Sequence, residues 1–246
     1  MSLELLFQDV DTGSEELAKE ELSNNSGSSF VNSCGVFKGT IERCFVTETK
    51  KGGVCLDLHI SGENIYTTKL YPVIVKDGKK VTTYSVKGKT QSLADYKMLK
   101  QLVFVATGKG QELKDIKIDV QDIAYKEYGK DVTVNGGMLT DLIGKEIQFG
   151  VRLEEQYNYE DGEVDKTALK TNNNGDVVYD KKLFSIYSIE GKTALEIVKK
   201  EEAKQVEKDK EFLASDKGIR RVKLEVPEIE DVEDVVDDSD DDTIDF

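Results

Sequence analysis

Apolar and polar residues alternate along three stretches in the first half of the chain. Residues 36–46 are rich in β-branched and aromatic side chains, and residues 54–60 and 65–75 repeat the same period of two. Such alternation is typical of half-buried strands. Three consecutive strands are therefore expected. Gly39 interrupts the first of them, where a mid-strand glycine predicts a bulge or a sharp coil.

The second of these stretches has two chemically different faces. Val54, Leu56, Leu58 and Ile60 share one face, and we expect that face to line the core. Cys55, Asp57 and His59 share the other face, and we expect that face to meet solvent or a ligand. After the third stretch, Lys76-Asp77-Gly78-Lys79 is a strong hairpin signal, with a return strand expected over 81–86.

A helical period follows the hairpin. Ser92 is a predicted N-cap, Asp95 stands at the third helical position, and Gly108 predicts the end of the helix. Residues three or four apart form the apolar stripe of this helix, and they are Leu93, Tyr96, Leu99, Leu102, Val103 and Ala106.

The second half of the chain adds strands and a second helix. Residues 109–141 are mixed, with a strand expected within 115–125, and 146–153 alternate again. The polar stretch 156–176 is predicted to be a long loop that leads to a strand over 177–189. Thr193 and Glu196 form a capping box that opens a helix reaching about Leu213.

Three strands, a helix and two closing strands are the element order of an OB-fold. This fold is a five-stranded Greek-key barrel, here with its helix between the third and fourth strands. We therefore predict a mainly β fold with accessory helices, an OB-fold with insertions. The expected organisation is an acidic N-terminal arm and linker over 1–29, the nucleic-acid-binding domain over 30–213, and a linker with a disordered acidic tail over 214–246.

Charge is distributed unevenly along the chain. The formal net charge is −15, yet residues 225–246 contain twelve acids and no base, and residues 1–28 contain seven acids and one lysine. Subtracting −12 and −6 from −15 leaves about +3 for the remainder. Within it, residues 66–90 hold six lysines against one acid, Asp77. The pattern indicates a mildly basic domain joined to an acidic C-terminal tail.

The acidic tail should be disordered, because it repels itself and has few apolar side chains to bury. It ends in an aliphatic residue and an aromatic one, which a tail used only for solubility does not require. We therefore expect the end of the tail to bind a partner, through Asp240, Asp241, Asp242, Ile244, Asp245 and Phe246.

Several function classes find little support. The chain has three cysteines, one histidine and no CxxC motif, so neither a disulfide framework nor a metal site is expected. No catalytic constellation is recognisable, and we predict a protein that is not an enzyme and needs no cofactor. No apolar run approaches the roughly 18 residues of a membrane span. We expect a reduced, cytoplasmic protein that makes no membrane contact.

Binding of single-stranded nucleic acid finds more support. It needs basic groups for the backbone and aromatic faces for the bases, and an OB-fold uses its second and third strands and two of its loops. The candidate residues lie where such a barrel would present them, and they are Arg43, Lys50, Lys51, Lys69, Tyr71, Lys76, Lys79, Lys80, Tyr84, Lys87, Lys89, Arg152, Tyr157 and Tyr159. Core packing of the tyrosines and a merely solvated lysine hairpin remain alternatives.

A lysine- and aromatic-rich domain followed by an acidic tail that ends in Phe246 resembles single-stranded DNA-binding proteins, particularly those of tailed bacteriophages. The bacterial type ends in aspartates followed by Ile-Pro-Phe. Here Thr243 is extra, Asp245 replaces the proline, and there is no tryptophan and no Gly/Gln-rich linker. These departures favour the phage type, as a monomer or a dimer.

The resemblance implies that the body coats single-stranded DNA during phage replication and recombination. It also implies that the tail recruits a polymerase, helicase or primase and competes with DNA. Two alternatives stay open: a structural or chaperone-like interaction protein with an acidic shielding tail, and an RNA-binding OB protein.

Overall fold

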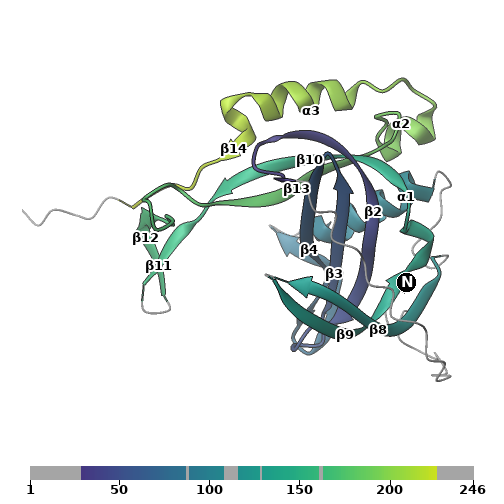
Figure 1. The fold of residues 1–246 in the computed structure, drawn as a ribbon, viewed down its shortest axis with the longest axis horizontal. Helices are drawn as coiled ribbons and strands as arrows, with labels where there is room; N and C mark the ends of the chain where they lie inside the picture. Colours follow the sequence, from purple (N-terminus) through teal and green to yellow (C-terminus); the bar gives the residue numbers. More distant parts are fainter. Residues whose placement is uncertain (1–28, 87–88, 108–115, 128, 161–162, 226–246) are drawn as a thin grey trace, which may run out of the picture. The chain divides into compact units, whose positions relative to one another are not determined.

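A computed structural model describes residues 29–86, 89–107, 116–127, 129–160 and 163–225 (Figure 1). Among these residues, strands are the main element, which confirms the predicted mainly β class. The main sheet contains ten strands: β1 (Ser29–Phe30), β2 (Gly35–Glu48), β3 (Val54–Gly62), β4 (Asn64–Lys76), β5 (Lys79–Val81), β8 (Ile118–Glu127), β9 (Lys130–Leu139), β10 (Glu146–Glu155), β13 (Tyr179–Ser188) and β14 (Ile219–Arg220).

Two further ribbons and three helices complete the described elements. The ribbons pair β6 (Thr83–Val86) with β7 (Lys89–Ser92), and β11 (Tyr157–Glu160) with β12 (Glu163–Leu169). The α-helices are α1 (Ala94–Thr107), α2 (Ala194–Lys199) and α3 (Gln205–Ala214), with short 3₁₀ turns at Thr140–Leu142 and Asp216–Gly218.

The strands of the main sheet follow the order β1-β4-β3-β2-β10-β13. The long strand β2 organises this order, because it pairs with β3 on one side, with β10 near its start and with β9 near its end. Figure 1 shows the strong curve that lets β2 reach all three neighbours. The irregular register lies between Ile41 and Arg43. Gly39 allows β2 to pass close to β3, because a Cβ at this position would lie only 2.7 Å from the Ser61 carbonyl oxygen.

The core lies on one face of this curved sheet. Val54, Leu56, Leu58 and Ile60 are all buried, as their alternation predicts. α1 adds Leu99, Leu102 and Val103, while β10 adds Ile147, Phe149 and Val151. The Tyr66 ring stacks on Phe149 with centroids 5.3 Å apart. Burying these apolar side chains is the main force that folds the domain.

The sheet does not close into a barrel. Its ordered path ends at β13 on one side and at β4 with the short β1 on the other, with no hydrogen-bonded ladder between β4 and β13 in the described residues. α1 contacts both of these strands. The Tyr66 hydroxyl also donates to the Lys181 carbonyl at 3.2 Å. The two sides are therefore linked by a helix and side-chain contacts rather than by a ladder.

Several predicted boundaries were wrong. Ser92 belongs to β7 instead of capping a helix, because residues 83–92 fold back as a separate ribbon. The Asp95 carboxylate accepts from the Tyr71 N–H at 2.7 Å, so it holds β4. The predicted loop 156–176 contains the β11–β12 hairpin. The strand expected within 115–125 is confirmed as β8, which forms a hairpin with β9 around Gly129, whereas Gly108 lies outside the described residues.

The predicted helix from Thr193 to Leu213 is two helices. Thr193 does form the capping box with Glu196 that the sequence predicts. Lys200 then adopts a left-handed conformation, with φ of 56°, which ends α2. The second carboxylate oxygen of Glu196 accepts the N–H groups of Lys204 and Gln205, both at 2.8 Å, at the start of α3. One buried carboxylate therefore caps both helices.

This double cap predicts a pH-dependent stability. Burial alone would raise the pKa of Glu196, but the N–H groups of Thr193, Gln205 and Lys204 outweigh it and lower the pKa from 4.5 to about 2. The stabilisation is therefore complete above about pH 4.5 and is lost as pH falls toward 2. Glu196→Gln should cost roughly 2–3 kcal/mol of unfolding free energy at pH 6, and less at pH 3.

Urea unfolding across this pH range measures the difference. Glu201→Gln is the matched control, because Glu201 is an exposed acid five residues away and should change stability little at any pH. A cost for Glu196→Gln that stays constant between pH 6 and pH 3 would contradict the role of the ionised carboxylate.

The chain divides into two compact units. Among the described residues, the first unit comprises those within 29–154 and 179–221, and the second comprises those within 155–178 and 222–225. Within the second unit, the segment 222–225 runs along the β11–β12 hairpin. The Glu225 N–H donates to the Lys166 carbonyl at 3.0 Å, and the Tyr157 hydroxyl donates to the Lys223 carbonyl at 2.8 Å.

Candidate nucleic-acid interface

Two neighbouring turns of the first unit gather lysines at one end of the main sheet. The turn between β2 and β3 carries Lys50 and Lys51, and the turn between β4 and β5 is flanked by Lys76, Lys79 and Lys80; all five are exposed. Asp77 and Gly78 have positive φ, as the hairpin signal predicts. The turns adjoin, because a Cβ on Gly52 would lie 3.6 Å from Val75 and Lys80 pairs with Glu48 at 3.4 Å. We call these five residues the lysine end.

β4 leads from the lysine end onto the outer face of the sheet. Lys69 and Tyr71 are both exposed on this face, two residues apart, with 47% of Tyr71 exposed. Because alternate residues of a strand share one face, the two side chains stand next to each other. The Asp95 carboxylate holds the Tyr71 backbone in place. The aromatic ring therefore stands beside a cation on a fixed strand.

Arg43 does not join this surface. It is 7% exposed, and its Nε and Nη2 both donate to Asp57 Oδ1, at 3.3 Å and 3.1 Å. Its guanidinium carbon lies 4.2 Å from the centroid of the Tyr125 ring. The β8–β9 hairpin therefore covers Arg43, and the guanidinium is used inside the protein.

The outer face of β3, which was expected to meet solvent or a ligand, is largely covered within the protein. Asp57 is 3% exposed because it pairs with Arg43 under the hairpin, and Cys55 is buried as well. His59 is half-buried, with Nδ1 2.9 Å from the Thr67 hydroxyl and Nε2 3.5 Å from Glu42. Burial, and then the neighbouring Arg43, lower the pKa of His59. His59 therefore adds little positive charge at neutral pH.

Arg152 lies apart from the lysine end. It is half-buried on β10, and its guanidinium carbon is 5.9 Å from the centroid of the Phe212 ring of α3. Phe212 in turn stacks on Phe184 of β13, with centroids 5.5 Å apart. Arg152, which was predicted to contact phosphate, therefore lies where α3 packs against the sheet.

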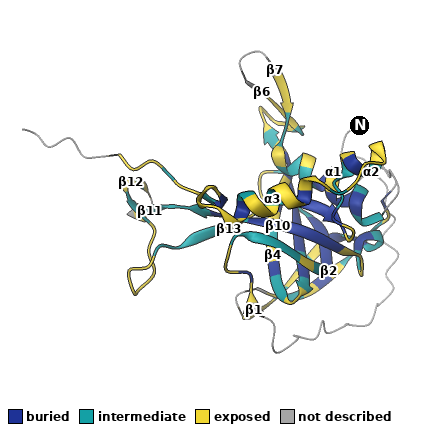
Figure 2. Ribbon diagram, turned by 90° about the horizontal axis from the view of Figure 1, so that it is seen from above, coloured by how far each residue is buried: buried dark blue, intermediate teal, exposed yellow. Residues whose placement is uncertain are grey.

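The β6–β7 ribbon carries Tyr84, which is 38% exposed and donates to Gln91 Oε1 at 3.2 Å. Figure 2 shows this ribbon as an exposed projection from the first unit. Lys87 lies outside the described residues, and Lys89 is described only as part of the backbone of β7. Tyr84 is available for stacking, while the placement of these two lysines stays a prediction.

Tyr157 and Tyr159 belong to the second unit. Tyr157 is half-buried and donates to the Lys223 carbonyl, whereas Tyr159 is 63% exposed opposite Val164. Residues 155–178 hold six acids and two lysines, a net charge of −4. This charge disfavours contact with phosphate. The role of Tyr157 and Tyr159 in DNA binding stays a prediction.

The predicted partner-binding end lies outside the described residues. This applies to Asp240, Asp241, Asp242, Ile244, Asp245 and Phe246.

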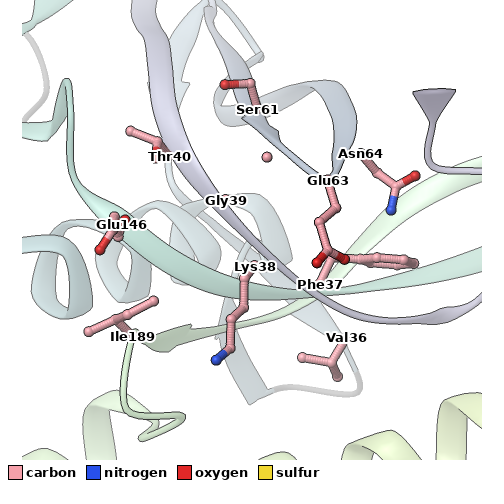
Figure 3. A pocket seen from close by; sticks show the side chains of 11 residues that line it. Val36, Phe37, Lys38, Gly39, Thr40, Ser61, Glu63, Asn64, Glu146 and Ile189 are labelled. Carbon is pink, nitrogen blue, oxygen red and sulfur yellow. The ribbon is translucent and has the colours of Figure 1, made fainter. Parts of the chain in front are cut away.

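The first unit also contains a surface pocket of about 550 Å³ (Figure 3). It lies where the start of β2 passes the β3–β4 turn. Its charged lining residues are Lys38, Glu63 and Glu146, of which two are acids. A pocket with this balance does not attract phosphate. The candidate interface is therefore the lysine end with Lys69 and Tyr71.

Sequence reasoning missed two residues that shape this surface. Tyr125 covers the Arg43–Asp57 pair, and Glu48 neutralises part of the lysine end through Lys80. Alternating Ile123, Tyr125, Val132 and Val134 on either side of Gly129 carry the signal of the covering hairpin. This alternation predicts a hairpin with one apolar face, and in the structure Tyr125 of that face packs against Phe45 of β2.

No family model matches the chain, and no curated protein shows significant similarity to it. In the part of the chain that the structure describes, no helix is long and apolar enough to cross a membrane. No group of three or more His, Cys, Asp or Glu side chains among the described residues could hold a metal ion.

Proposed function

We propose that this protein binds single-stranded DNA without sequence preference, as a phage-type protein of DNA replication and recombination. The observation that carries the proposal is the lysine end beside Lys69 and Tyr71. Five exposed lysines from two adjoining turns offer contacts for phosphates, and Tyr71 offers a face on which a base can stack. Neither group requires a particular base.

The arrangement of strands supports the same proposal. We propose that β2, β3, β4, α1, β10 and β13 are an open variant of the OB-fold, with the helix between its third and fourth strands. OB-folds hold oligonucleotides on the face of their second and third strands, which correspond to β3 and β4 here. Lys69 and Tyr71 belong to β4.

The acidic tail supplies the second half of the proposal. Its twelve acids compete with DNA for cations, and this competition weakens as salt screens it. Its end recruits replication proteins through Ile244 and Phe246, whose apolar side chains fit a pocket with a basic rim.

Tyr71→Ala should lower affinity for oligo-dT by roughly 1–3 kcal/mol, because it removes the stacking face. The free energy of unfolding should change less, since the ring is 47% exposed. Fluorescence anisotropy and urea unfolding measure the two quantities. Phe30→Ala is the control, because it removes an aromatic ring that is 59% exposed outside the candidate interface and should cost less affinity. A loss of stability as large as the loss of affinity would show that Tyr71 is a packing residue.

RNA would meet the same lysines and the same tyrosine. Titration with oligo-rU beside oligo-dT separates the two nucleic acids. Tighter binding of oligo-rU would replace DNA by RNA in the proposed function. Binding of neither would leave a protein-interaction role.

A further inference from the structure

The strand β8 has one edge that no described strand pairs with. It comprises ten residues, Ile118–Glu127, and in the described part of the chain it pairs with β9 alone. β9 in turn joins β2, so β8 is the outermost strand of this branch of the sheet (Figure 1). The N–H and C=O groups along such an edge are a template for another strand.

The register of the hairpin decides which backbone groups of β8 face away from β9. Glu127 pairs with Lys130 across the tight turn at Gly129. The residues that flank such a turn are hydrogen-bonded to each other, and bonded pairs then recur at every second residue. The odd-numbered residues of β8 therefore bond to β9. The backbone groups of Asp122, Ala124 and Lys126 point to the outer edge.

The side chains of these three residues are self-complementary. All three are exposed and, as alternate residues of a strand, share one face. An acid and a base thus stand on either side of a small residue, and Asp122 also accepts from Asn135 Nδ2 at 3.0 Å. If a second β8 runs antiparallel about Ala124, Asp122 of each copy lies opposite Lys126 of the other. A register centred on Asp122 would instead oppose two carboxylates, which is destabilising.

We propose that two copies of this chain form a dimer by pairing their β8 strands in antiparallel fashion, with Ala124 opposite Ala124. This pairing adds about six hydrogen bonds between the strands. It also adds two symmetric Asp122–Lys126 pairs, which favour this register. A second copy fits the edge because a two-fold contact uses the same residues on both sides. One strand pair is a small interface, so a dissociation constant in the micromolar range is expected.

The dimer goes beyond the proposed function and does not depend on it. It doubles the number of lysine ends that one DNA strand can contact. The test below contains no nucleic acid. A failure of the dimer therefore leaves DNA binding measurable, and the reverse also holds.

Sedimentation velocity of the full-length protein across the micromolar range tests the dimer. A monomer–dimer equilibrium that depends on concentration is expected. Asp122→Lys alone, or Lys126→Asp alone, places like charges opposite each other at both symmetric contacts. Each variant should raise the dissociation constant of the dimer by about tenfold or more.

Mixing these two variants tests the pairing itself. A heterodimer of one copy with Asp122→Lys and one copy with Lys126→Asp has opposite charges at both contacts. The mixture should therefore recover the dimer that each variant alone has lost. The double variant, with both substitutions in one chain, exchanges the two charges and should dimerise like the original protein.

Matched variants of the same hairpin serve as controls. Lys130→Asp and Asp131→Lys reverse exposed charges on β9 and should leave the dimer unchanged. Ala124→Pro removes the central N–H of the outer edge without removing a bond to β9, and it should give a monomer. Circular dichroism checks that each variant is folded. A monomer at every concentration, or a dimer that the single charge variants do not weaken, would overturn the proposal.

Discussion

Arg43→Met should lower the free energy of unfolding by about 3–5 kcal/mol, because it leaves the Asp57 carboxylate buried without its partner. Both Arg43–Asp57 hydrogen bonds lie inside the protein, with side-chain exposures of 8% and 4%. The substitution also removes the cation that lies over the Tyr125 ring. Urea unfolding at neutral pH measures the loss.

Two matched variants separate this effect from ordinary surface charge. Arg43→Met combined with Asp57→Leu should recover most of the stability, because a buried ion pair is often replaceable by apolar residues. Lys210→Met breaks the exposed Lys210–Glu207 pair and should cost less than about 1 kcal/mol. If Arg43→Met stays stable and loses DNA affinity instead, Arg43 contacts phosphate after all.

Reversing three lysines of the lysine end should weaken binding of single-stranded DNA by about 100-fold or more in 0.1 M salt. The variant is Lys50→Glu, Lys51→Glu and Lys79→Glu. A charge pair at contact distance contributes about 1 kcal/mol in water, and each 1.4 kcal/mol corresponds to tenfold in affinity. Losing three phosphate contacts should also reduce the magnitude of the slope of log affinity against log salt by roughly 2. Stability should change little, because all three side chains are exposed.

Net charge alone could produce part of this loss, so a second triple variant is required. Lys208→Glu, Lys210→Glu and Lys217→Glu change the net charge by the same amount on exposed residues of α3 and the turn after it. This control should lose far less affinity than the lysine-end variant. Equal losses would show that binding responds to total charge and not to the proposed surface.

The parts of the fold that alternation could predict are those with one buried face. β2, β3, β4, β10 and β13 were all expected near their observed positions, because their inward residues are apolar. A return strand was expected over 81–86, where β6 lies, but its pairing with β7 was not expected. The β11–β12 ribbon was missed, since two exposed faces leave no periodic apolar signal. The break between α2 and α3 was missed because it depends on Glu196 reaching the start of another helix.

The candidate site could be predicted where it depends on local sequence. Turns expose their side chains, so the lysines beside Gly52 and Gly78 are exposed as expected. Arg43 is different, because its surroundings come from a hairpin about 80 residues later in the chain. A strand pattern shows which face a residue occupies, but it does not show what covers that face. Arg152, covered by α3, illustrates the same limit.

The central claim is sequence-tolerant binding of single-stranded DNA, and a salt titration tests it most directly. Labelled oligo-dT, a mixed-sequence strand and a duplex are titrated with the full-length protein, and anisotropy gives the affinities. With four to six phosphates neutralised, log affinity should fall against log salt with a slope of roughly −3 to −4. The two single strands should bind alike and more tightly than the duplex. A flat salt response, or tighter binding of the duplex, would contradict the account.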